Sequence, residues 1–255
     1  MTAEPMTHAR FLECLAADEA RLREVAAPDL TAQVPSCPEW TVADLVEHVA
    51  VVYLHKVECM RRGVLPRPWP PDVSGEAPIA LLDRAYAALS AEFAERAPDS
   101  ASFTWYPADQ TVAFWVRRMA QETVIHRVDA ELGAGQPVAP IPDDLAVDGV
   151  DEVLERFLAF GSVEWKEDFG DLLTKIGGGT VLVSTGGRDW LLSMESDAVR
   201  VGPATGTTTP DAQVTGDPQA VLLWLWRRAA AGAVAVSGDP RAVDGLRELL
   251  GAATQ

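Results

Sequence analysis

Histidine is scarce in this chain of 255 residues, so the positions of the four that occur are informative. Glu122 and His126 are four residues apart, so in a helix their side chains lie on one face about one turn apart. A carboxylate and an imidazole at this spacing can reach the same metal ion. His48 lies in another stretch, where the apolar neighbours Leu45 and Val49 have the spacing of the buried side of a helix. Helices packed in a bundle can bring such residues together at its centre.

Two imidazoles and one carboxylate form a three-ligand set of the kind that binds zinc, nickel or iron(II) and leaves a position open for water or substrate. We therefore interpret His48, Glu122 and His126 as candidate ligands of one divalent ion. The competing interpretation is that Glu122 and His126 form an ordinary contact within one helix and that no metal binds. Val124 and Ile125 give this pair apolar neighbours, which favours a partly buried position.

The first half of the sequence predicts the helices that must position these side chains. Apolar residues recur at helical spacing over four segments, which are residues 7–26, 42–62, 79–96 and 111–132. Thr41 followed by Asp44 is typical of a capping box and marks the start of the second segment. Prolines crowd residues 64–78 and predict a loop, and residues 97–110 form another irregular connection. Four helices with two longer connections predict a helical bundle.

The second half predicts a mixed domain in which most strands come before the last helices. A helix over residues 143–160 precedes the strands, and two more helices cover residues 218–231 and 240–250. The short segments of β type are residues 180–184, 190–194, 198–201, 212–215 and 234–237. This order predicts an α+β fold. Glycine and proline mark a boundary near residues 135–150, so we predict a helical domain of residues 1–140 and a smaller domain of residues 141–255.

The overall charge restricts the classes of partner. A formal net charge of −17 and a pI near 4.5 disfavour binding to nucleic acid or to an anionic membrane surface. No apolar stretch of the kind found in a signal peptide or a membrane span is evident, so we expect a cytoplasmic protein. Three cysteines without a CxxC pair do not predict a disulfide framework. We expect a monomer, because no heptad pattern and no long exposed edge strand is evident.

Three motifs resemble the mycothiol-dependent maleylpyruvate isomerase family, and together they span most of the chain. Residues 37–48 (CPEWTVADLVEH) and residues 122–131 (ETVIHRVDAE) resemble its N-terminal domain, a DinB-like metal-binding four-helix bundle. Residues 217–228 (DPQAVLLWLWRR) are similar to its small C-terminal domain, a sterol-carrier-like α/β module. The resemblance therefore implies this pair of domains.

The resemblance also implies a divalent ion, usually zinc, with nickel or iron(II) as alternatives, bound by His48, Glu122 and His126. It also implies mycothiol as a low-molecular-weight thiol cosubstrate. This cosubstrate is chemically consistent with a metal site, because a metal-bound thiol deprotonates readily and the thiolate is the nucleophile. The implied function is an isomerase or a thiol S-transferase acting on a small electrophile, maleyl-like or bearing a carboxylate. The alternative is a non-catalytic protein that binds a metal or a hydrophobic ligand. A structural ion in such a protein would have a fourth protein ligand.

Arginine is suited to a substrate carboxylate because its guanidinium forms bidentate pairs. Arg228 is similar to an arginine that ends the family's C-terminal Leu-Trp motif, and the resemblance makes it our candidate catalytic residue. The family usually has glycine before that arginine, whereas this chain has Arg227. The sequence leaves open which of the two arginines faces the pocket, and both could be surface residues.

Further positions also have alternative interpretations. Asp129 lies about one turn beyond the histidine of the helical pair and could orient it, but we prefer an ordinary surface aspartate. His55 lies about two turns beyond His48, too far away to share an ion, and we expect it to be solvated. Trp224 and Trp226 are expected in the core of the second domain.

Overall fold

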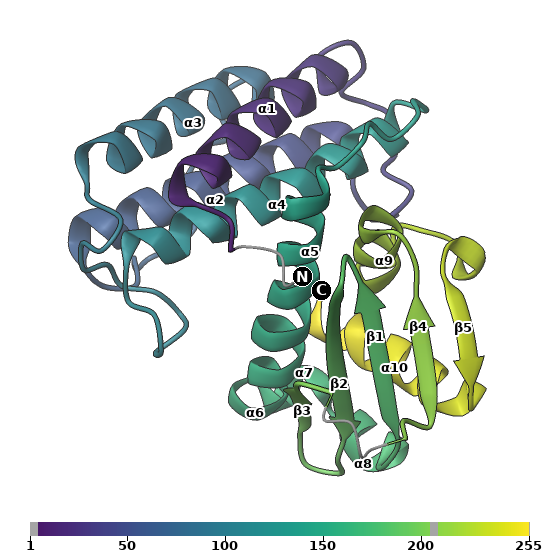
Figure 1. Ribbon diagram of the computed structural model, residues 1–255. Coiled ribbons are helices and arrows are strands. Elements are labelled where there is room, and N and C mark those ends of the chain that lie inside the picture. The colour runs from purple at the N-terminus through teal and green to yellow at the C-terminus, as the bar shows by residue number, and fades with distance from the viewer. Residues whose placement is uncertain (1–4, 205–208, 255) are drawn as a thin grey trace. The chain divides into compact units, whose positions relative to one another are not determined.

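The computed structural model describes residues 5–204 and 209–254 (Figure 1). Contacts between Cα atoms divide the chain into a helical unit, Met6–Ala139, and a mixed unit that contains Pro140–Gln255. The predicted fold class is confirmed, because the first unit is helical and the second contains a small mixed sheet with helices. Within the described ranges, no helix combines the length and the apolar composition that a membrane span requires.

The helical unit consists of four long helices whose bounds match the predicted segments closely. They are α1 (His8–Ala26), α2 (Val42–Arg62), α3 (Pro78–Glu95) and α4 (Val112–Gly133). The predicted capping box is present, since the backbone N–H of Thr41 donates to the carboxylate of Asp44 at 2.8 Å and the Thr41 hydroxyl accepts from the Asp44 N–H. Gly63 ends α2 in a left-handed conformation with φ 67°.

The helix α4 lies at the centre of the bundle, and most of its side chains are buried. It packs against α1 and α2, while α2 also packs against α3 (Figure 1). A helix buried on nearly all sides has no solvated face, so its polar side chains need partners inside the protein. The buried polar residues of α4 are Arg118, Gln121, Thr123, His126, Arg127, Asp129 and Glu131.

The mixed unit begins with helices and continues into a five-stranded sheet. Its helical elements are α5 (Asp143–Glu152), the π-helical segment η1 (Val153–Phe160), α6 (Gly161–Glu164), α7 (Lys166–Phe169), α8 (Leu172–Ile176), α9 (Pro218–Leu225), the 3₁₀ turn η2 (Ala231–Ala233) and α10 (Pro240–Ala253). The strands are β1 (Thr180–Thr185), β2 (Arg188–Met194), β3 (Val199–Gly202), β4 (Ala212–Thr215) and β5 (Ala235–Gly238).

The sheet has the strand order β3-β2-β1-β4-β5. The β1–β4 pair is parallel, and the other neighbouring pairs are antiparallel. Val183 of β1 lies opposite Trp190 of β2 and Val214 of β4, and all three side chains are buried. α10 packs against β1 and β4, and η1 packs against β3. The expected core positions of Trp224 and Trp226 are confirmed, since these side chains are 1% and 8% exposed.

Two helix predictions in the mixed unit were wrong in their details. The helix predicted over residues 143–160 is α-helical to Glu152 and then π-helical to Phe160. The helix predicted over residues 218–231 ends at Leu225, because the chain turns sharply at Arg227, which has φ 62°. Arginine gives no sequence signal for such a turn, since glycine is the usual residue in a left-handed helix cap. The short helices α7 and α8 were not predicted.

Candidate metal centre

The packing of α2 against α4 brings the three candidate ligands together. One ligand atom from each of His48, Glu122 and His126 lies within 4.8 Å of the others. Oε1 of Glu122 is 3.3 Å from Nε2 of His48 and 3.2 Å from Nε2 of His126. The His48 side chain is 36% exposed, whereas those of Glu122 and His126 are 13% and 11% exposed. The group is therefore shielded within the bundle and reaches solvent beside His48.

The two carboxylate oxygens of Glu122 have different partners. Oε1 faces both imidazoles, while Oε2 accepts a hydrogen bond from Nη2 of Arg118, one turn earlier on α4. Burial alone would raise the pKa of Glu122. The charge of Arg118 and the contacts with His126 and His48 outweigh burial and hold that pKa well below its usual range. Glu122 is therefore an ionised carboxylate with one oxygen directed at the two imidazoles.

His126 is oriented by a buried carboxylate. Nδ1 of His126 lies 3.0 Å from Oδ2 of Asp129, whose side chain is fully buried, and the hydroxyl of Ser36 donates to Oδ1 of Asp129. When Nδ1 carries a proton, it donates to Asp129, and this hydrogen bond orients the ring so that Nε2 faces Glu122. The same arrangement is found around histidine ligands of metals. The prediction that Asp129 is a surface aspartate was wrong, because α4 has no solvated side at this turn.

The protonation of His126 is set by its two carboxylate neighbours. Burial alone would lower its pKa, but the neighbouring Glu122 and Asp129 carboxylates outweigh burial and raise the pKa to about 9. The imidazole is thus a cation at neutral pH and pairs with Glu122. A divalent ion that binds Nε2 of His126 must displace this proton, because histidine ligates metals in its neutral form.

The donor set fits a divalent ion with an open position. Two imidazole nitrogens and one carboxylate oxygen suit zinc, nickel or iron(II). Among the residues that the structure describes, no fourth histidine, cysteine, aspartate or glutamate joins His48, Glu122 and His126. A closed structural zinc site has four protein ligands, so this grouping favours a site that also takes water or a ligand.

A cavity of about 300 Å³ adjoins His48. Trp40 contributes one wall, and its ring centroid lies 4.8 Å from that of His48 and 6.3 Å from that of His126. The sequence placed Trp40 before α2 but gave no sign that its indole covers both imidazoles. The remaining lining residues come from α2 and from the proline-rich loop, namely Asp44, Glu47, Val51, Pro70, Pro71 and Val73.

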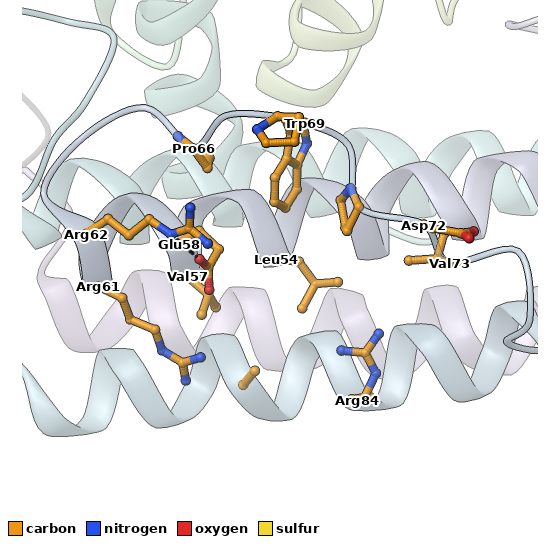
Figure 2. A pocket seen from close by; sticks show the side chains of 13 residues that line it. Leu54, Val57, Glu58, Arg61, Arg62, Pro66, Trp69, Asp72, Val73 and Arg84 are labelled. Atoms are coloured by element: carbon orange, nitrogen blue, oxygen red, sulfur yellow. Dashed lines mark ion pairs between the residues drawn. The ribbon is translucent and has the colours of Figure 1, made fainter.

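A second cavity, of about 350 Å³, continues along α2 and shares Pro71 and Val73 with the first. Figure 2 shows Trp69 and Pro66 on the loop that crosses α2, with Arg84 projecting from α3. The three arginines that line this second cavity are each paired with a glutamate: Arg61 with Glu92, Arg62 with Glu58 and Arg84 with Glu76. The positive charge in this cavity is therefore balanced by protein carboxylates.

His55 lies beside this second cavity rather than in solvent. It is half-buried and its ring contacts that of Trp69, with centroids 5.0 Å apart. Burial and the charge of Lys56 lower the pKa of His55 from 6.5 to about 4, so this histidine is neutral at physiological pH. The expectation of a solvated histidine was wrong, because the proline-rich loop folds back over this part of α2.

Arg227 and Arg228 belong to the mixed unit and point in different directions. Nη1 of Arg228 donates to the carbonyl of Trp226 at 2.8 Å, and its guanidinium lies 5.9 Å from the centre of the Trp226 ring. Arg227 is exposed, and its guanidinium lies against Gly251 of α10. The assignment of Arg228 to a substrate carboxylate stays a prediction.

Comparison with known proteins gives matches to both halves of the chain. Residues 11–131 match the family model described as the mycothiol maleylpyruvate isomerase N-terminal domain, and residues 144–251 match the model described as the MDMPI C-terminal domain. No curated protein sequence matches the chain.

Solved structures show the same fold over almost the whole chain. The crystal structure of a mycothiol-dependent maleylpyruvate isomerase is similar with a TM-score of 0.61 and 16% sequence identity, and the match covers 92% of this chain and 95% of that one. A mutant of such an enzyme, with one histidine replaced by alanine, is similar with a TM-score of 0.59, the same identity and the same coverage. At this identity the likeness establishes the fold alone.

Proposed function

The chain belongs to the mycothiol maleylpyruvate isomerase family, and we propose that it is a metal- and thiol-dependent enzyme acting on a small electrophile. The thiol that we propose is mycothiol, and the substrate is a maleyl-like or other carboxylate-bearing molecule. We further propose that residues 1–140 form the metal-binding domain and that residues 141–255 supply Arg228. The convergence of His48, Glu122 and His126 beside a cavity is the observation that supports this function most strongly.

The chemistry that a bound zinc ion supplies at such a site is acidification of a coordinated thiol, which reacts as the thiolate. The protein side chains prepare the site for this. Asp129 holds the proton on Nδ1 of His126, so that Nε2 is directed inward. Arg118 holds Oε2 of Glu122, so that Oε1 is directed inward. The Trp40 ring lies beside both imidazoles and forms part of the cavity that adjoins His48.

In an isomerisation, the thiolate sulfur forms a bond to one alkene carbon, and the π electron pair moves toward the conjugated carbonyl. Rotation about the resulting single bond follows. The electron pair then returns, the carbon–sulfur bond breaks, and the thiolate leaves the trans alkene. In a thiol transfer, a proton is delivered to the carbanionic carbon and the sulfur stays on the product. We propose that Arg228 binds the substrate carboxylate in either reaction through a bidentate pair.

The test is turnover by the full-length protein loaded with zinc, supplied with mycothiol and maleylpyruvate. Proton NMR distinguishes the cis alkene from the trans alkene, and mass spectrometry detects a thiol adduct. We expect turnover that requires both the thiol and the metal and that is abolished in Glu122→Gln. If metal-loaded protein produces neither a trans isomer nor an adduct from a panel of electrophilic acids, the enzymatic proposal is wrong and the binding-protein alternative is favoured.

A further inference from the structure

The end of α9 places an arginine in a backbone conformation that glycine usually occupies. The N–H of Arg228 donates to the carbonyl of Leu223 at 2.7 Å, and the N–H of Arg227 donates to that of Trp224 at 3.1 Å, which is the Schellman pattern. Arg227 has φ 62° and is the single non-glycine residue with positive φ in the described part of the chain. A side chain in this region is strained, so its retention points to a use for the guanidinium.

The guanidinium of Arg227 occupies a space that glycine provides on α10. A Cβ atom at Gly251 would lie 2.4 Å from Nη1 of Arg227. Arg247 is four residues before Gly251 and therefore lies on the same face of α10. Burial and, after it, the charge of Arg227 lower the pKa of Arg247. Two guanidiniums of like charge are thus held close together.

Both guanidiniums line one cavity of about 380 Å³, which lies wholly within the mixed unit. Nη1 of Arg247 is buried without a hydrogen-bond partner, and the guanidinium lies 4.8 Å from the centre of the Trp224 ring. A buried donor on a charged group is costly when it has no acceptor. An arginine with an unused donor therefore lines the cavity beside a second positive charge.

Protein carboxylates lie near this pair without forming ion pairs with it, and the nearby charge of Asp244 opposes the lowering of the pKa of Arg247 only in part. Over residues 5–204 and 209–254, neither Arg227 nor Arg247 takes part in an ion pair, in contrast to the arginines around the cavity in Figure 2. Asp168 and Glu248 also line the cavity, but both are exposed and neither pairs with an arginine. The two arginines are therefore free to pair with an anion from outside the chain.

We propose that Arg227 and Arg247 form a binding site for a small oxyanion with two negative charges, such as a phosphate group or a dicarboxylate. Two guanidiniums offer several N–H donors in planar arrays that match the oxygen pairs of carboxylate and phosphate groups. A second negative charge on the ligand offsets the repulsion between the arginines. The site shares no residue with the group His48, Glu122 and His126.

The test is isothermal titration calorimetry of the full-length protein at low ionic strength, with inorganic phosphate and succinate as separate probes. We compare the wild type with Arg227→Gly, Arg247→Met and the matched control Arg241→Met, which changes an exposed arginine on the same helix. Glycine suits the backbone of residue 227, so Arg227→Gly should melt at the same temperature or higher. Weaker binding in that variant cannot then be attributed to unfolding.

We expect at least one probe to bind with one site per chain, and each of Arg227→Gly and Arg247→Met to weaken binding about tenfold or more, as for loss of a charge-assisted hydrogen bond. Arg241→Met should bind as the wild type does. Binding of phosphate alone identifies a phosphate site, and binding of succinate alone identifies a carboxylate site. Binding of neither probe, or equal binding in wild type and both variants, overturns the proposal.

Discussion

Asp129 and His126 form a hydrogen-bonded pair inside the helical bundle, with Oδ2 of the carboxylate 3.0 Å from Nδ1 of the imidazole. Asp129 has no exposed side-chain surface, and its other oxygen accepts from Ser36. Asp129 lies on α4, the helix that also carries the candidate ligands Glu122 and His126. Its buried carboxylate fixes the orientation of the His126 ring.

Replacing Asp129 with alanine should weaken zinc binding about 10- to 100-fold, because the carboxylate that orients His126 is lost. Competition with a chromophoric chelator measures the change in affinity. Ser36→Ala is the milder control, since it removes one partner of Asp129 and leaves the contact with His126. Unchanged zinc affinity in folded Asp129→Ala protein would show that this contact does not support a metal site.

Arg118→Met should destabilise the metal-free protein by about 3 kcal/mol, because it removes one of the two cations that pair with the buried carboxylate of Glu122. Zinc should recover much of this loss, so the increase in Tm on adding zinc should be larger in the variant than in the wild type. The control is Arg62→Met, because Arg62 is exposed and loss of its pair with Glu58 should cost about 1 kcal/mol or less. An equal response to zinc in Arg118→Met and wild type contradicts the role given to Glu122.

The difference in stability between Lys56→Met and the wild type should depend on pH. Burial lowers the pKa of Lys56 from its ordinary value of 10.5 to about 8, against the opposing charge of Glu122. Between pH 8 and pH 10.5 the unfolded chain binds more protons at Lys56 than the folded protein does. The stability of the wild type therefore rises with pH over this interval. Lys56→Met should therefore gain stability over the wild type at pH 7 and show less of that gain at pH 9.5.

Chemical denaturation of both proteins at the two pH values measures this difference. Lys166→Met, at an exposed position of the mixed unit, is the control and should show no such trend. A stability difference between Lys56→Met and wild type that stays constant from pH 7 to pH 9.5 would mean that Lys56 is charged in the folded protein throughout that interval.

Replacing Arg228 should separate turnover from metal binding. We expect Arg228→Met to lower kcat/KM about 100-fold, equivalent to one strong charged contact with the substrate, while the zinc content stays at the wild-type level. Arg200→Met, which removes an exposed pair with Glu195 on the sheet, is the control. Normal turnover in Arg228→Met would remove this arginine from the proposed mechanism.

The sequence predicted the long helices of the bundle and one pair of candidate ligands because these features depend on local spacing. The capping box at Thr41 and the four-residue interval from Glu122 to His126 are properties of single helices. His48 was grouped with this pair because its apolar neighbours predict the buried side of another helix, and the family resemblance implies the same group; the structure brings the three side chains together.

Features that depend on packing between elements could not be read from spacing. Asp129 has the same spacing from His126 whether it is buried or exposed, and only the packing around α4 makes it a partner of that imidazole. His55 is covered by a loop whose prolines predict irregular structure but not its direction. The turn after Leu225 escaped prediction because Arg227 occupies a backbone conformation that a sequence normally signals with glycine.

The most direct test of the central claim is the metal content of the purified, zinc-reconstituted protein, measured by plasma mass spectrometry. Wild type is compared with His48→Ala, His126→Ala and the control His55→Ala, which removes a histidine on α2 outside the candidate centre. We predict about one ion per chain in the wild type and in His55→Ala, and loss of most of it in the other two variants. Wild-type protein without metal, or equal metal in all four proteins, would contradict the account.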